Sequence, residues 1–312
     1  MDIAAIVKNG APYPSLTAQL GLTPSTDVDV PVSCVFLVLY ILAAASHMTI
    51  FQVNRRKGHK FIPSVIVFGF CMMRNLTCCL RIGSAYKPTN VSLGIASGIF
   101  VNAGVLALFV LDLLFAQRCL RAAFPRFGWT KLVHNVFLVN YLLIPCVLIM
   151  VIVTTVYAHY TLDSGALKSC RDALLAVSSY MVFFSLLPLA LAIGIAMAPK
   201  GTDRENFGTG SFAAKLWIVG VTSFLLCLGA TFRAAVNFMP PRPATNPYSF
   251  QGRACFYIFY FTLEVLVVYT FLFTRIDKRF WIPNGSRGTY LVDGLAKETS
   301  EETFAEDKPH TI

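Results

Sequence analysis

The sequence predicts an all-α protein built as a bundle of seven transmembrane helices, and three observations support this. Apolar residues make up 56% of the 312 residues and charged residues only 13%, against roughly 45–50% and about 25% in soluble proteins. The charged residues gather in short segments between long apolar runs. Seven of these runs reach the roughly 20 residues that a helix needs to cross a membrane. This pattern excludes an ordinary soluble enzyme, a disordered chain and a nucleic-acid-binding module, so no nucleic acid is expected as a partner.

The seven predicted spans are separated by short segments rich in Gly, Pro and charge, as loops should be. The spans are 30–53, 61–84, 92–117, 132–157, 172–198, 216–238 and 254–274. The connecting segments are, in order, 54–60, 85–91, 118–131, 158–171, 199–215 and 239–253. Pro145 and Pro188 should kink the fourth and fifth spans. The membrane domain therefore covers 30–274, between an N-terminal segment 1–29 and a tail 275–312.

The distribution of Lys and Arg predicts the orientation. Seventeen lie in the segments on the side of the tail and six on the side of the N-terminus. Because basic residues are retained in the cytosol, the N-terminus should lie outside and the C-terminus in the cytosol. We therefore expect an integral membrane protein, located in the plasma membrane. The tryptophans agree, since all three lie at predicted cytosolic ends of spans, where an indole belt is expected: Trp129, Trp217 and Trp281.

Four ionisable side chains inside the spans form a candidate intramembrane polar core. Arg74 lies near the middle of the second span and Glu264 near the middle of the seventh. Charges inside a bilayer are costly, so we expect these two to pair near the midplane, as a functional site or as packing. Asp112 and His47 fall at similar depth, and a hydrogen-bonded packing pair is favoured over a proton-linked role for them.

Two further arginines and three cysteines define sites near the ends of spans. Arg81 and Arg233 lie toward the outer side and form a candidate site for an anionic headgroup or carboxylate; the alternative for Arg233 is that it snorkels to the interface. Cys170 and Cys255 are both predicted to lie outside and could form a disulfide. Cys119, between two arginines at the cytosolic end of the third span, is a candidate for palmitoylation.

The tail is expected to have two parts. The segment 275–282 is basic and aromatic, which suits it to lie on an anionic leaflet. From about residue 287 the chain is expected to be disordered.

Catalytic signatures are absent from the sequence. It contains no H-E-x-x-H, no Walker loop and no G-x-S-x-G. The five histidines are scattered, which disfavours a membrane zinc hydrolase. We therefore expect no enzyme, no metal site and no cofactor.

Several stretches resemble a family of uncharacterised fungal seven-span membrane proteins with a domain of unknown function. They are PSTDVDVPVS (24–33), NRRKGHKFIPS (54–64), FGFCMMRNLTCCLRI (68–82), FPRFGW (124–129), CLGATFRAAVNFMPPRP (227–243), GRACFYIFYFTLE (252–264) and RIDKRFWIPNGS (275–286). Arg233 before a loop and an aromatic-rich last span more distantly resemble the fungal lipid-translocating exporter family, although Asn237 stands where that family has an acidic residue. The first resemblance implies architecture and location, not a reaction.

Two classes of function stay open. The favoured one is a receptor-like sensor of a small or lipidic ligand, which would relay a change to a cytosolic signalling partner. The alternative is a transporter or translocase of a lipid or amphiphile, with a lateral or outer opening lined by Arg81, Arg233 and Glu264. An intramembrane enzyme is a remote third. Membrane lipids are expected as partners in each case, and the sequence does not indicate an oligomeric state.

Overall fold

The structure is a computed structural model that describes residues 10–15, 17–199, 204–282 and 290. The regular secondary structure of these residues is helical, apart from one isolated β-bridge between Thr17 and Pro243. The helices are α2 (Asp29–Arg56), α3 (Ile62–Tyr86), α4 (Val91–Ala123), α5 (Pro125–Gly128), α6 (Lys131–Tyr160), α7 (Ser164–Met197), α8 (Phe212–Phe238), η1 (Ser249–Gln251), α9 (Arg253–Tyr257), the π-helix η2 (Ile258–Thr262), α10 (Leu263–Phe273) and α11 (Ile276–Arg279).

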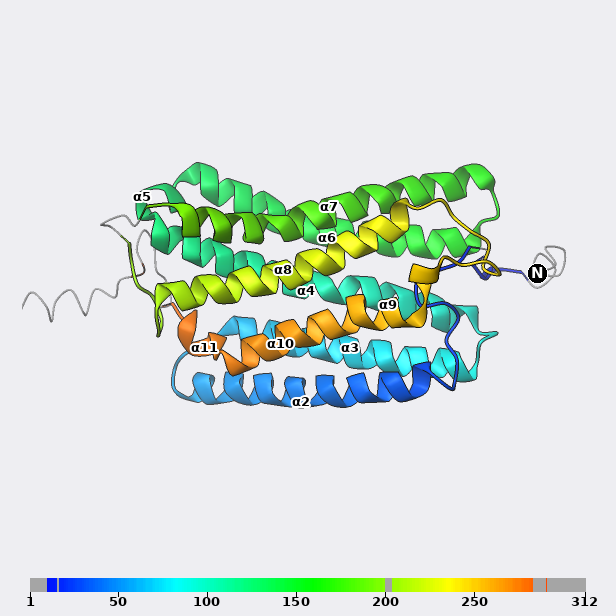
Figure 1. The fold of residues 1–312 in the computed structure, drawn as a ribbon, viewed down its shortest axis with the longest axis horizontal. Helices are drawn as coiled ribbons and strands as arrows, with labels where there is room; N and C mark the ends of the chain where they lie inside the picture. Colours follow the sequence, from blue (N-terminus) through cyan, green and yellow to red (C-terminus); the bar gives the residue numbers. More distant parts are fainter. Residues whose placement is uncertain (1–9, 16, 200–203, 283–289, 291–312) are drawn as a thin grey trace, which may run out of the picture.

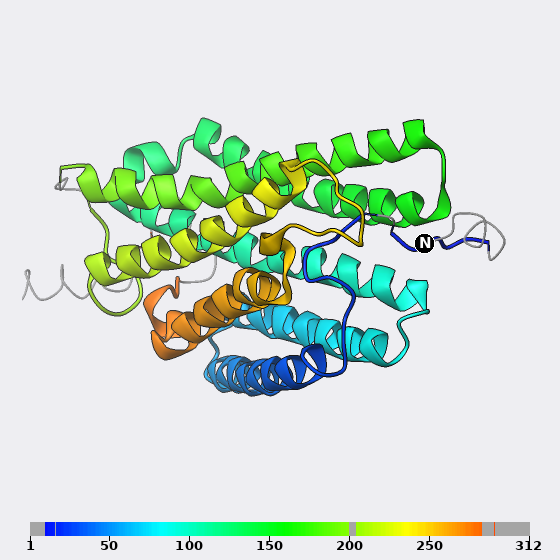
Figure 2. The same cartoon turned by 45° about the vertical axis from the view of Figure 1, so that its right-hand side comes forward.

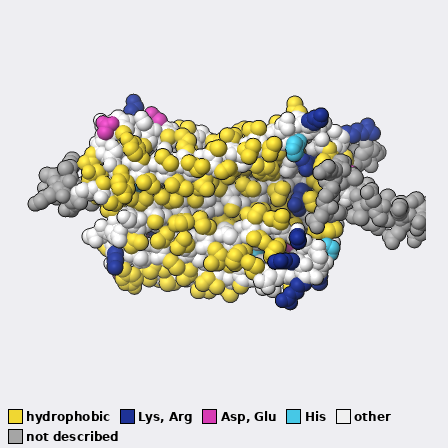
Figure 3. Space-filling model, turned by 180° about the vertical axis from the view of Figure 1, so that it is seen from behind, with side chains coloured by type: hydrophobic (Ala, Val, Ile, Leu, Met, Phe, Trp, Pro, Cys, Tyr) yellow, Lys and Arg dark blue, Asp and Glu magenta, His cyan; other side chains and the backbone are white. Residues whose placement is uncertain are grey.

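Seven of the described helices are long and apolar enough to cross a membrane, which indicates an integral membrane protein. They are α2, α3, α4, α6, α7, α8 and the continuous segment Arg253–Phe273 formed by α9, η2 and α10. They run side by side along the long axis of the molecule (Figure 1). On the face shown in Figure 3, hydrophobic side chains cover the surface between the two ends, and Lys and Arg gather near the ends. This is the surface that a bilayer requires.

The central helix of the bundle is α4. It packs against α3, α6, α7 and α8, and 61% of its most apolar stretch is buried, against 17% for α6. In both ribbon views α4 runs between a group formed by α2, α3 and α10 and a group formed by α6, α7 and α8 (Figures 1 and 2). Side chains on α4 therefore meet partners from both halves of the bundle.

Local sequence explains where several of the long helices begin. A side-chain oxygen at each N-cap accepts a hydrogen bond from a backbone N–H of the first turn, which satisfies a donor that the helix itself cannot. These caps are Asn90 for α4, Thr130 for α6, Asp163 for α7 and Ser211 for α8. The cap at Asp163 explains why α7 starts at Ser164, well before the predicted span at 172. The polar stretch that follows, which contains Lys168 and Arg171, continues this helix beyond the apolar run.

The two ends of the bundle are closed by segments of the chain. At one end, called here the N-face, the segment 10–28 lies against the loop 239–252, with Gly21 N–H donating to the Gln251 carbonyl at 2.9 Å. At the opposite end, the C-face, the chain turns back at Arg275 (φ 51°) and α11 follows. Thr209 N–H donates to the Lys278 carbonyl at 3.0 Å. The loop before α8 is thus tied to α11.

The expectation that 275–282 lies on a leaflet is wrong for its central residues. Ile276 is 2% exposed and Phe280 is 0% exposed. The Phe280 ring packs on Phe115 of α4 with centroids 4.5 Å apart, and its carbonyl accepts a hydrogen bond from Arg118. The segment docks because its apolar side chains fill the C-face. The expected disorder from about 287 lies outside the described residues, except at Tyr290, which is buried against Phe207.

Candidate functional site

Arg74 and Glu264 form an ion pair in the middle of the bundle, as predicted. Nε of Arg74 lies 2.5 Å from Oε2 of Glu264, and Nη2 lies 2.7 Å from Oε1. The two side chains are 0% and 2% exposed. The remaining Arg74 nitrogen, Nη1, donates to the Val101 carbonyl of α4 at 3.0 Å. This two-point geometry is the strong form of an arginine–carboxylate pair.

Arg233 of α8 is a third member of this cluster; the sequence analysis grouped it with Glu264 only in the transporter alternative and did not predict that the two form an ion pair. Its Nη2 donates to Oε1 of Glu264 at 2.7 Å, and its side chain is 11% exposed. The guanidinium lies 3.9 Å from the centre of the Tyr260 ring. Its Nε is buried and has no hydrogen-bond partner among the described residues. We call Arg74, Arg233 and Glu264 the charged triad; it contains two cations and one anion.

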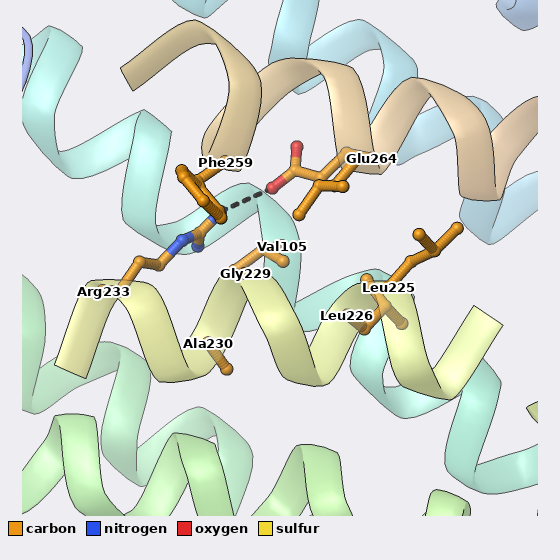
Figure 4. A pocket seen from close by; sticks show the side chains of 9 residues that line it. Val105, Leu225, Leu226, Gly229, Ala230, Arg233, Phe259 and Glu264 are labelled. Carbon is orange, nitrogen blue, oxygen red and sulfur yellow. Dashed lines mark hydrogen bonds and ion pairs between the residues drawn. The ribbon is translucent and has the colours of Figure 1, made fainter. Parts of the chain in front are cut away.

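A small pocket adjoins the charged triad between α4, α8 and α10. Its cavity volume is about 10 Å³, room for about one water molecule. Figure 4 shows Arg233 reaching from α8 toward Glu264, with Phe259 beside its guanidinium. The lining residues are Val105, Leu225, Leu226, Gly229, Ala230, Arg233, Phe259, Leu263 and Glu264. The pocket therefore has an apolar wall and one charged edge.

The π-helix η2 places the charged triad. Thr262 Oγ1 donates to the Tyr257 carbonyl at 3.2 Å, five residues back. A π turn shifts the helical register and so changes which side chains after it face the bundle. Gly229 of α8 allows this backbone to approach, because a Cβ there would lie 3.2 Å from the Phe259 carbonyl oxygen. One turn further along α8, Arg233 then reaches Glu264.

A second charged cluster lies at the N-face, around Asp29. Nη2 of Arg81 lies 2.6 Å from Oδ1 of Asp29, and Nε of Arg253 lies 2.8 Å from Oδ2. The Tyr257 hydroxyl also donates to Oδ1 of Asp29 at 2.8 Å. Arg81 donates to the Gly21 carbonyl as well, at 2.9 Å. This cluster holds the N-terminal segment against α3 and α9.

The predicted outer site formed jointly by Arg81 and Arg233 is therefore wrong. Arg81 is committed to Asp29 and Arg233 to Glu264, in two separate clusters. The physical reason is that each guanidinium finds a carboxylate on a neighbouring helix, which lowers the cost of burying its charge. Asp29, the first residue of α2, is a site residue that the sequence analysis missed because it lies at the boundary of a predicted span.

Asp112 and His47 do not form the predicted hydrogen-bonded pair. The Asp112 carboxyl group of α4 lies within hydrogen-bond distance of the Thr222 and Ser223 hydroxyls of α8. His47 of α2 lies with Nε2 3.4 Å from the Val268 carbonyl of α10. The two residues therefore have different neighbours, because α4 faces α8 where α2 faces α10. Of the four residues of the predicted polar core, Arg74 and Glu264 belong to the charged triad. Asp112 and His47 each make a separate polar contact.

Neither of the two cysteine predictions, the disulfide and the palmitoylation site, holds in this structure. Cys170 and Cys255 are free thiols. They lie on α7 and α9, which are apart in both ribbon views (Figures 1 and 2). Cys119 is 0% exposed, because α4 continues past it to Ala123 and is packed there. An acyltransferase could not reach its sulfur for palmitoylation.

In the part of the chain that the structure describes, no group of three or more His, Cys, Asp or Glu side chains could hold a metal ion. The chemistry available to the charged triad is instead the recognition of an anion. A guanidinium with an unused N–H next to a pocket can bind a carboxylate or phosphate oxygen.

A comparison with protein families matches about half of the chain. The family is described as "Protein of unknown function (DUF3112)", and its model matches residues 125–212 and 213–281. The match covers α6, α7, α8 and the segment from α9 to α11, so it includes Arg233 and Glu264. No curated protein and no solved structure matches the chain.

Proposed function

The chain belongs to DUF3112, a family of proteins of unknown function, and from that premise we propose that it is a receptor-like membrane protein. Its ligand would be an amphiphile with an anionic head, bound beside Arg233. A cytosolic partner would read the resulting change. The proposed location is the plasma membrane with the N-face outside, which the excess of Lys and Arg on the opposite side supports.

The observation that carries this proposal is the charge of the triad. Two guanidinium groups share the single carboxylate of Glu264 in an apolar bundle. An excess positive charge at membrane depth is costly, and ionisable groups kept there at such cost usually serve a function. A ligand carboxylate or phosphate would balance the charge and use the unpartnered Nε of Arg233.

The position of the pocket suits a ligand that arrives from the membrane. Arg233 is the most exposed member of the triad. Next to the pocket residues, α8 and α10 present large apolar side chains on the surface, with Leu228 41% and Leu266 48% exposed. These side chains would contact an alkyl tail while the head reaches Arg233. An amphiphile fits this arrangement better than a water-soluble anion does.

The connection between Glu264 and the C-face supports a sensor. Glu264 belongs to α10, and α10 leads through Arg275 into α11. The loop before α8 is bonded to α11 through Thr209 and Lys278. A ligand anion bound at Nε would share the Arg233 guanidinium with Glu264, which would weaken the contact of α8 with α10 and so shift both elements that meet at the C-face.

The experiment measures binding of a fluorescent medium-chain fatty acid to the purified protein in lipid nanodiscs. We expect Arg233→Gln to weaken binding at least tenfold. The control variant Arg171→Gln removes an arginine that donates to the Met239 carbonyl at the surface, and it should bind as the wild type does. The matching fatty alcohol should bind weakly to all three. Equal binding of acid and alcohol, or wild-type binding by Arg233→Gln, would refute the proposal.

The same probe separates the sensor from a transporter. In sealed vesicles containing the protein, a sensor should bind the fatty acid without speeding its movement between leaflets. Protein-dependent movement that Arg233→Gln abolishes would instead identify a transporter of the same ligand class.

A further inference from the structure

Asp112 is a buried carboxyl group that the charged triad does not use. It lies on α4 and is 1% exposed. Its Oδ1 lies 2.6 Å from Thr222 Oγ1, and its Oδ2 lies 2.5 Å from Ser223 Oγ. Both hydroxyls belong to α8, so every side-chain hydrogen bond of this carboxyl group crosses the α4–α8 contact.

The number of hydrogen atoms available for these contacts favours a protonated carboxyl group. A hydroxyl group has one hydrogen to donate. Thr222 Oγ1 lies within hydrogen-bond distance of Asp112 and also of the Ile218 carbonyl, at 2.9 Å. If Thr222 donates to Ile218, as threonines in helices often do, then the short contact to Asp112 needs a hydrogen on Asp112 itself. Ser223 then donates to the other carboxyl oxygen, and every group is satisfied.

The surroundings provide no charge to stabilise an ionised form. Among residues 10–15, 17–199, 204–282 and 290, no cation forms an ion pair with Asp112. The other buried carboxylates with ion pairs, Asp29, Glu264 and Asp277, each have at least one arginine. An isolated carboxylate buried at membrane depth would cost several kcal/mol.

Ionisable side chains on the helices around Asp112 are bonded elsewhere or neutral. On α8, Lys215 donates to Asn206 and to the Phe207 carbonyl, and Arg233 to Glu264. Others on α3, α4, α6 and α7 with a partner include Arg74 (Glu264), Arg81 (Asp29), Arg118 (Phe280 carbonyl), Tyr141 (Gln117) and Tyr180 (Asn140 carbonyl). The thiols of Cys71, Cys78 and Cys119 are buried and free.

We propose that Asp112 is a proton-binding site that couples proton release to separation of α8 from α4. In the packed bundle the carboxyl group keeps its proton, because ionisation would leave an unpaired charge between two helices. When α8 moves away, water reaches the carboxyl group from the C-face, and the proton passes to that water. This inference rests on the α4–α8 contact and does not depend on the proposed ligand.

The first test is infrared spectroscopy of the detergent-solubilised protein at neutral pH. A protonated carboxyl group gives a C=O stretching band that is separate from the bands of ionised carboxylates and shifts in D₂O. We expect the band in the wild type and its loss in Asp112→Asn, which keeps the shape and a donor. A wild type without the band, or a band that persists in Asp112→Asn, would overturn the proposal.

The second test compares thermal stability across pH. A carboxyl group that holds its proton in the folded state releases it on unfolding above about pH 4, the ordinary value for Asp. The wild type should therefore lose stability relative to Asp112→Asn as the pH rises above about 4. A constant difference would contradict the inference. If Asp112→Asn fails to fold, Ser223→Ala serves instead, and its infrared band should shift in position because one hydrogen bond is lost.

The same stability measurement in NaCl and in KCl addresses a bound sodium ion. Stabilisation of the wild type by Na⁺ but not K⁺, lost in Asp112→Asn, would show a sodium site in place of a proton site and would overturn the proposal. Equal behaviour in the two salts together with the infrared band supports it.

Discussion

At the scale of single residues, Glu264 determines the electrostatic balance of the bundle. It is the only carboxylate in the triad and accepts hydrogen bonds from both Arg74 and Arg233. The two arginines are not equivalent. Arg74 is fully buried and also bonds the Val101 carbonyl, whereas Arg233 is partly exposed. Substitutions in the triad should therefore differ in their effect according to the charge that each leaves behind.

We predict that Glu264→Gln destabilises the protein more than Arg233→Gln does, because it leaves two buried guanidiniums without a carboxylate. Breaking a buried ion pair in this way costs about 3–5 kcal/mol. Arg233→Gln leaves a balanced Arg74–Glu264 pair and should cost much less. Thermal unfolding in detergent measures the difference. Equal loss of stability for Glu264→Gln and Arg233→Gln would contradict this account of the triad.

Asp277 at the C-face predicts a pH dependence of the opposite sign to that of Asp112. Burial raises its pKa, but hydrogen bonds from Arg275 and Asn54 and the charge of Arg275 outweigh this, so its pKa lies below its ordinary value. A carboxylate with a lowered pKa stabilises the fold above its unfolded pKa, and this contribution is lost as the pH falls.

Asp277→Asn should therefore reduce stability at neutral pH, and the difference from the wild type should shrink as the pH falls below about 4. The loss at neutral pH should be on the order of 1 kcal/mol, because Arg275 is half exposed and solvent screens the pair. Thermal unfolding as a function of pH measures it. A difference that grows at low pH would contradict this assignment.

At the scale of elements, the contact between η2 and α8 determines where Arg233 can reach. The rings of Phe232 and Phe259 are stacked with centroids 3.8 Å apart. Gly229 lies in the same contact, against the Phe259 carbonyl. A π turn in a helix is a local departure from the regular hydrogen-bond pattern, and here a glycine on the neighbouring helix accommodates it.

We predict that Gly229→Ala destabilises the protein by about 1–2 kcal/mol, because its Cβ would press on the Phe259 carbonyl oxygen. Gly220→Ala on the same helix is the matched control. A Cβ at Gly220 meets no atom within 4 Å, so this change should be neutral or stabilise by up to about 1 kcal/mol through helix propensity. Thermal unfolding distinguishes the two, and equal effects of both variants would show that the contact with η2 is unimportant.

At the scale of the whole molecule, segments outside the long helices close both ends of the bundle. The segment 10–28 covers the N-face through Gly21 and Arg81. At the C-face, α11 and Phe280 fill the space between α4 and the loop before α8. Charge is distributed unequally between these ends, and this inequality predicts the orientation in the membrane.

We predict that an epitope tag at the N-terminus is accessible to antibody on intact cells, whereas a tag at the C-terminus becomes accessible only after permeabilisation. The physical reason is the excess of basic residues on the side of the C-face. Immunofluorescence at the cell surface measures it. The reverse pattern would overturn the orientation, and staining of internal membranes alone would overturn the proposed plasma-membrane location.

The sequence by itself predicted seven membrane-spanning helices and the pairing of Arg74 with Glu264. Long apolar runs need no tertiary information to be recognised, and two opposite charges near the middle of their spans have few other partners in a bilayer. The sequence could not predict the helix ends, as the early start of α7 at Ser164 shows. Caps and packing, not hydropathy, determine them.

The tertiary structure decided the remaining partners. Arg233 belongs with Glu264 because the π turn in η2 and the close approach at Gly229 bring α8 to α10. Arg81 pairs with Asp29, and Asp112 with Thr222 and Ser223. Each of these contacts depends on which helices are neighbours and how each is rotated about its axis. Apolar runs that are hydrophobic on all sides leave both undetermined, so only packing of the whole bundle specifies them.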